Sequence, residues 1–79
     1  MQPNNVYRIK DLYLASFIYS QQKELIKIDR EGGTCWFVFA DKTSCEALAS
    51  LYWSNKAVGQ VKAIVDAIRS LKDMVFAQR

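Results

Sequence analysis

The chain has 79 residues, 51% of them hydrophobic, and a formal net charge of +3. A chain this short forms one domain and buries only about 60% of the surface that its unfolded form exposes, so it needs an efficient core. No segment reaches the roughly 20 apolar residues that cross a bilayer, and the first residues lack the basic start and apolar stretch of a secretory signal. We therefore expect a cytoplasmic protein with no membrane partner.

The N-terminal end carries Pro3 and paired asparagines, which oppose regular structure. We expect residues 1–5 to be flexible and residues 6–79 to form a single α+β domain. Residues 6–10 alternate apolar and basic side chains, which is typical of a short strand or of an extended lead-in.

The first predicted helix covers about residues 12–22, with Asp11 in the position of an N-cap. It is apolar on nearly every side, and Ser16 and Ser20 are its small polar breaks. Helices of this kind are covered on more than one side. This helix is therefore either sandwiched between other elements of the fold, or it has an exposed side that a partner covers. We expect it to carry more apolar surface than so small a domain can bury.

A β-hairpin is predicted next. Residues 24–29 form its first strand, residues 30–33 its turn and residues 34–40 its second strand, because paired glycines supply the positive φ angles of a tight hairpin. Alternation along the second strand places Trp36 and Val38 on one face. The other face receives Cys35, Phe37 and Phe39.

Two more helices are expected to follow. Thr43 and Glu46 have the spacing of a capping box, and the helix from about residue 44 to residue 53 places Cys45, Leu48, Ala49 and Tyr52 on one side. The last helix covers about residues 58–78, with apolar side chains at three- and four-residue spacing over an arc of about 120°. The predicted fold is an antiparallel hairpin packed with three helices, in the order (β)-α-β-β-α-α.

Catalysis is not indicated. The chain contains no histidine, so the usual proton shuttle near neutral pH and the usual partner of a cysteine nucleophile are missing. Cys35 and Cys45 are most simply small buried hydrophobic residues, although a disulfide stays open. We expect no catalytic residue, no metal site and no cofactor.

Nucleic-acid binding is an alternative. The strand around Phe37 and Phe39 resembles part of the RNA-recognition motif over residues 33–49, where aromatic side chains stack on bases. With nearby basic residues, the candidate contacts are Arg8, Lys10, Lys27, Phe37 and Phe39. On the last helix the basic residues are opposed by acidic ones, in Lys62–Asp66 and Arg69–Asp73 pairs, so that face is self-neutralising.

Surplus aromatic surface is the main functional signal. Tyrosine and tryptophan are enriched at binding hot spots because they combine a large area with a polar tip. The candidate protein interface consists of Tyr13, Phe17, Tyr19, Tyr52 and Trp53.

Three short segments carry a resemblance to a known family. Residues 11–15 (DLYLA), residues 36–41 (WFVFAD) and the Leu71–Lys72 pair resemble a family of short bacterial and phage proteins known as a domain of unknown function. The resemblance spans about residues 7–76. It implies a bacterial or phage setting and supplies no active site.

The leading hypothesis is a non-enzymatic, intracellular protein-interaction module that self-associates, with the first helix and the Tyr52–Trp53 corner as its contact surface; its partner is expected to be a second copy or another protein. The first alternative is a small nucleic-acid-binding protein that uses the hairpin face. The second alternative is a phage-encoded inhibitor of a host protein.

Overall fold

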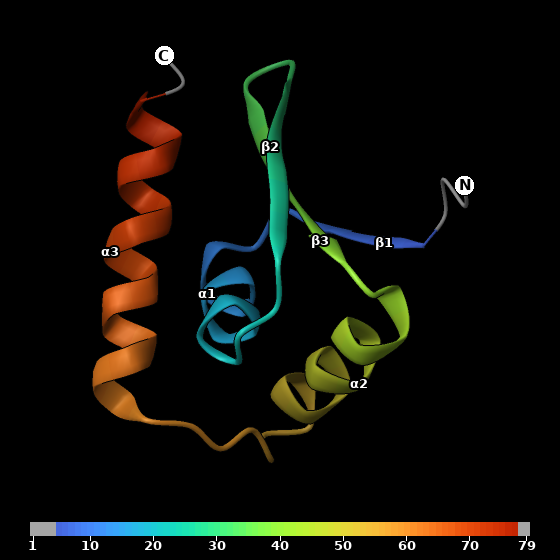
Figure 1. Cartoon of the computed structure of the whole chain (residues 1–79). Helices are drawn as coiled ribbons and strands as arrows, with labels where there is room; N and C mark the ends of the chain where they lie inside the picture. The colour runs from blue at the N-terminus through green and yellow to red at the C-terminus, as the bar shows by residue number, and fades with distance from the viewer. Residues whose placement is uncertain (1–4, 78–79) are drawn as a thin grey trace.

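The computed structural model describes residues 5–77 of the chain (Figure 1). Its elements, in order, are β1 (Val6–Ile9), α1 (Leu12–Ser20), β2 (Leu25–Glu31), β3 (Thr34–Ala40), α2 (Lys42–Trp53) and α3 (Val61–Ala77). The α+β fold and the order of elements predicted from the sequence are confirmed. The predicted flexible end, apart from Asn5, and the predicted helix end at Gln78 lie outside the described residues. Within those residues no helix is long and apolar enough to cross a membrane.

The sheet has the strand order β1-β3-β2, and both neighbouring pairs are antiparallel. β3 is therefore the central strand. The β2–β3 turn is tighter than predicted, because β2 continues to Glu31 and only Gly32 and Gly33 connect the strands, with φ values of 54° and 88°. Positive φ at both central positions is the geometry that favours glycine in a two-residue hairpin.

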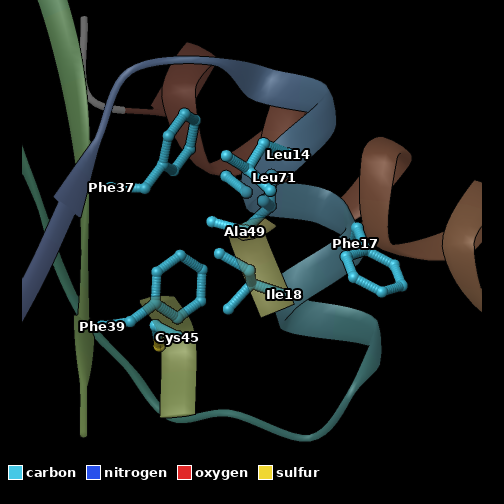
Figure 2. Packing of buried hydrophobic residues seen from close by; sticks show 9 residues of the cluster. Leu14, Phe17, Ile18, Phe37, Phe39, Cys45, Ala49 and Leu71 are labelled. Carbon is cyan, nitrogen blue, oxygen red and sulfur yellow. The ribbon is translucent and has the colours of Figure 1, made fainter. Parts of the chain in front are cut away.

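One face of the sheet carries the core. Phe37 and Phe39 are 2% and 0% exposed, and they point from β3 toward the helices (Figure 2). The facing layer consists of Leu14 and Ile18 on α1 and Leu71 on α3, each fully buried. All three helices lie on this face of the sheet, and α1 lies between the strands and α3 (Figures 1 and 2).

The central position of α1 explains its composition. Five consecutive residues of this helix, from Leu14 to Ile18, are buried. The expectation that α1 has more apolar surface than the domain can hide is therefore wrong for most of the helix, because the sheet, α2 and α3 cover it together. Among its large side chains Tyr13 is the clear exception, with 57% of its surface exposed.

Two local hydrogen-bond arrangements make the burial of α1 possible. The Asp11 carboxylate accepts the N–H groups of Tyr13 and Leu14 at 2.9 and 3.0 Å, which confirms Asp11 as the N-cap. The buried Ser16 hydroxyl donates to the carbonyl of Leu12 at 2.7 Å. Two N–H groups at the start of this helix and the buried hydroxyl of Ser16 thus have local hydrogen-bond partners.

The start of α2 differs from the prediction. The cap is Asp41 and not Thr43, and the helix begins at Lys42. Asp41 adopts a φ of 66°, and its carboxylate accepts the N–H and the hydroxyl of Ser44 at 3.3 and 2.7 Å. Asp41 lies three residues before Ser44, so its carboxylate can accept the N–H of Ser44, which has no partner inside the helix. Asp41 is therefore the N-cap of α2.

The rest of the domain covers only part of the apolar side chains of α3. Ala67 and Leu71 are buried against α1, whereas Val61 is 77% and Val65 is 44% exposed. Of the predicted ion pairs on this helix, Lys62–Asp66 is present with a distance of 2.9 Å, and Arg69–Asp73 is not present among the ion pairs of residues 5–77.

Candidate functional site

The predicted interface aromatics converge, with one exception, on a groove at one end of the helical layer. We call this hollow the aromatic groove; its volume is about 580 Å³. α1, the end of α2 and the first half of α3 all contribute to it. Its principal lining residues are Tyr13, Phe17, Tyr52, Trp53, Ile64 and Ile68.

Three of these aromatic rings form a connected row. Phe17 and Tyr52 stack with their centroids 6.2 Å apart, and Tyr52 meets Trp53 edge to face at 5.0 Å. Ring pairs at these separations are favourable beyond the area that they bury. Because Phe17 is only 4% exposed, the row begins in the core and ends on the surface at Trp53, which is 64% exposed.

The predicted interface residues differ in how much of each side chain is exposed. Phe17 is a buried core residue that borders the groove, so its prediction as an interface residue is corrected. Tyr13 and Trp53 stand exposed at the sides. Burial raises the pKa of Tyr52, and the negative charge of Asp11 adds to the rise. The Tyr52 hydroxyl is thus protonated near neutral pH and able to donate a hydrogen bond.

The loop between α2 and α3 closes the end of the groove. Gly59 lies close to Ile64 and Gln21, and a Cβ at this position would be 3.1 Å from Ile64 Cδ1 and 3.1 Å from Gln21 Nε2. The Gln21 amide also donates to the carbonyl of Val58 at 3.5 Å. A side chain here would push the ends of the Ile64 and Gln21 side chains aside by a few tenths of an ångström, so a glycine fits this close approach best.

Exposed apolar side chains continue from the groove onto its rim. Val58 is 84% exposed in the closing loop, and Val61 is 77% exposed at the start of α3. Val58 adjoins Gly59 in sequence, and Val61 lies one helical turn before Ile64; both of these neighbours line the groove. Exposed apolar surface beside a hollow is typical of interaction sites.

Tyr19 does not belong to this groove. It lines a separate hollow of about 660 Å³ with β2 residues and Met74 of α3, and it is half-buried. The sequence places Tyr19 on the same helix as Tyr13, but the two residues open onto different sides of the molecule because their neighbours come from different elements.

The opposite face of the sheet carries two of the basic candidate residues, Arg8 and Lys27. Arg8 and Lys27 lie beside Val38 in the strand register, and although no helix covers this face, Val38 is only 3% exposed. Long basic side chains cover apolar surface with their aliphatic stems. Arg8 also forms ion pairs with Asp29 and Glu31, at 3.8 and 2.9 Å.

These contacts change the nucleic-acid prediction. Phe37 and Phe39 are core residues, so their prediction as base-stacking contacts is wrong: β3 turns both rings away from the open face. Arg8 and Lys27 are held by acidic partners, with Lys27 Nζ 3.5 Å from Asp29. Lys10 is exposed and lies 5.8 Å from the ring centroid of Trp36, the aromatic residue that the open face does carry.

The two cysteines were predicted to be small buried residues, with a disulfide left open. Cys35 is half-buried and Cys45 is buried, and both are free thiols. Within residues 5–77, no cluster of three or more cysteine, aspartate or glutamate side chains is arranged to hold a metal ion.

The aromatic residues of the groove were predicted from the sequence, but the α3 residues that line it, Ile64 and Ile68, were not. The periodicity of α3 identifies Ile64 and Ile68 as apolar, but it does not say that they meet Tyr13 and Tyr52. That information lies in the packing of α1 against α3. Comparison of the chain with protein-family models, with curated proteins and with solved structures finds no match in any of the three.

Proposed function

We propose that this protein is an interaction module that self-associates through the aromatic groove. The observation that carries the proposal is Trp53, a large aromatic side chain that is 64% exposed beside a hollow lined by apolar side chains. A protruding ring next to an apolar hollow is self-complementary. In a two-fold dimer, the Trp53 of each copy lies in the groove of the other, as a symmetric interface requires.

The size of the domain supports the same proposal. A 79-residue chain buries a smaller fraction of its surface than a larger domain does, and here the apolar residues Val58 and Val61 stay exposed close in sequence to residues that line the groove. Covering such side chains removes apolar area from water, which is the main driving force of association. The proposal includes no catalytic step.

Salt dependence separates this proposal from nucleic-acid binding. Each copy carries a net charge of +3, so two copies repel each other weakly, and added salt screens this repulsion. Self-association through apolar surface should therefore hold or strengthen as salt is raised. Binding to nucleic acid should weaken steeply, because phosphate contacts release counterions.

Sedimentation velocity over a series of protein concentrations tests the proposal. The unchanged protein should shift from monomer to dimer with rising concentration, and Trp53→Ala should move this shift to much higher concentration. Ile26→Ala is the matched control, because Ile26 is also exposed, at 46%, but lies on β2 outside the groove. A strict monomer at the highest concentration, or equal effects of the two substitutions, would contradict the proposal.

A further inference from the structure

A third hollow lies between the hairpin turn, the start of α1 and the C-terminal half of α3. We call it the hairpin pocket; its volume is about 490 Å³, within the range of small-molecule sites. It has no lining residue in common with the aromatic groove. Along α3, Ile64 and Val75 are separated by about 16 Å at 1.5 Å per residue.

The walls of the hairpin pocket are apolar and already in place. Phe37, a core residue that is 2% exposed, lines the pocket from β3. Leu12 of α1 and Val75 of α3 line it as well, and both are half-buried against the core cluster. Because these side chains are fixed by the core, an apolar ligand would enter without reorganising the fold.

The charged groups around the hairpin pocket have one sign. Lys10 and Lys72 line it, and no aspartate or glutamate does. Among residues 5–77 neither lysine forms an ion pair. The acidic neighbour of Lys10 in sequence, Asp11, is occupied by the N–H groups at the start of α1. Thr34 is a further polar residue of the lining.

We infer that the hairpin pocket binds a small amphipathic anion, with a carboxylate or phosphate head at Lys10 and Lys72 and an aliphatic or aromatic body against Leu12, Phe37 and Val75. Charge complementarity selects the head, because two ammonium groups with no ion-pair partner among residues 5–77 attract an anion. The apolar wall selects the body. This inference stands apart from the self-association proposal, since the two hollows lie on different parts of the fold.

Isothermal titration with four ten-carbon probes, each below its micelle concentration, tests the inference. Decanoate and decyl phosphate carry an anionic head, decanol has the same body without charge, and decyltrimethylammonium has the opposite charge. At least one of the two anions should bind more tightly than decanol, and the cation should bind most weakly; the tighter of the two anions identifies the preferred head group. Equal binding of decanol and both anions, or no binding of either anion, would overturn the inference.

Substitutions locate the binding. Lys72→Gln and Lys10→Gln should each weaken binding of the anions about two- to fivefold, the effect typical of one exposed charge pair. Lys56→Gln is the matched control, because Lys56 is exposed, forms no ion pair among the described residues and does not line the pocket. An equal loss in the Lys56 variant would show that the anions bind to net charge, which would also overturn the inference.

Backbone amide spectra provide a readout that does not depend on the variants. Bound decanoate should shift the resonances of Thr34 and Val75 and leave the indole resonance of Trp53 in place. Shifts at Trp53 without shifts at Thr34 would assign the ligand to the aromatic groove and contradict the inference. Self-association is scored in a separate experiment, so failure of one proposal is distinguishable from failure of the other.

Discussion

Arg8 covers the ring of Trp36, with the guanidinium carbon 4.3 Å from the ring centroid. The same guanidinium reaches Glu31, where Nη2 lies 2.9 Å from a carboxylate oxygen. One side chain on the short edge strand β1 therefore ties the central strand to β2 across the open face of the sheet. Among residues 5–77 the three helices lie on the other face of the sheet, the core side (Figure 2).

We predict that Arg8→Ala lowers the free energy of unfolding by about 1 kcal/mol, since a cation–π contact and an exposed ion pair each contribute a fraction of that amount. Urea unfolding monitored by far-UV circular dichroism measures the change. Lys10→Ala is the control, because Lys10 Nζ lies farther from the same ring, at 5.8 Å, and should cost less than about 0.5 kcal/mol. Equal losses would mean that Arg8 acts only through its charge.

The two aromatic residues of α1 that border the aromatic groove should respond very differently to truncation. Phe17 is 4% exposed and Tyr13 is 57% exposed, although they are one helical turn apart. We expect Phe17→Ala to cost about 3 to 5 kcal/mol and to unfold much of the protein, because it opens a cavity. Tyr13→Ala should cost about 0.5 kcal/mol or less.

Thermal unfolding of the two variants measures this difference. A large loss in the Tyr13 variant at low protein concentration, where the chain is monomeric, would contradict the assignment of Tyr13 to the surface. At high concentration the Tyr13 variant should lose stability relative to the unchanged protein, since association stabilises the folded state by mass action.

Much of this architecture could be predicted from the sequence because its signals are local. Gly32 and Gly33 mark the hairpin turn, alternation along residues 34–40 separates Trp36 from Phe37, and Asp11 marks the start of α1. Each of these signals depends on the backbone geometry of a few adjacent residues.

The coverage of α1 could not be predicted, because it depends on contacts with α3, which begins about 40 residues later in the chain. A helix that is apolar all round is consistent with both burial and a partner interface. For the same reason, the sequence names Tyr13 and Trp53 without showing that they share a groove. The hairpin pocket combines Lys10, Thr34 and Lys72, which no local pattern connects.

The cap of α2 gives a predicted pH dependence of stability. The hydroxyl of Ser44 and then its N–H donate to the Asp41 carboxylate and hold the pKa of Asp41 below its ordinary value. A carboxyl whose pKa is depressed in the folded state stabilises the fold above the unfolded pKa. That contribution is lost as pH falls through the folded pKa, so stability should fall in the acid range, beginning near the ordinary pKa of an aspartate and continuing below it.

Asp41→Asn should reduce this acid sensitivity. Asparagine keeps an oxygen that accepts from Ser44 and tolerates the φ of 66° at this position, but it does not titrate. Melting temperatures of both proteins, measured across the acid range, should converge at low pH. Parallel curves would show that Asp41 is not coupled to folding. Asp66→Asn is a useful comparison, since the pKa of Asp66 is lowered by its hydrogen bond from Lys62.

The two thiols should differ in reactivity. Cys45 is fully buried on α2, its thiol donates to the carbonyl of Ala40 at 3.4 Å, and burial followed by the charge of Asp41 raises its pKa. Both effects reduce the thiolate, which is the form that reacts. Cys35 is half-buried in the lining of the hairpin pocket.

We therefore expect iodoacetamide to modify Cys35 at least about tenfold faster than Cys45 in the folded protein, because Cys45 reacts only after local opening. Mass spectrometry of proteolytic peptides measures the two rates. In concentrated urea the rates should become similar, and in Cys35→Ser the fast phase should disappear. Faster modification of Cys45 than of Cys35 in the folded protein would contradict this prediction. It would mean that the core between α2 and β3 opens more readily than the hairpin end of the sheet, although Cys45 belongs to the same buried cluster as Phe39.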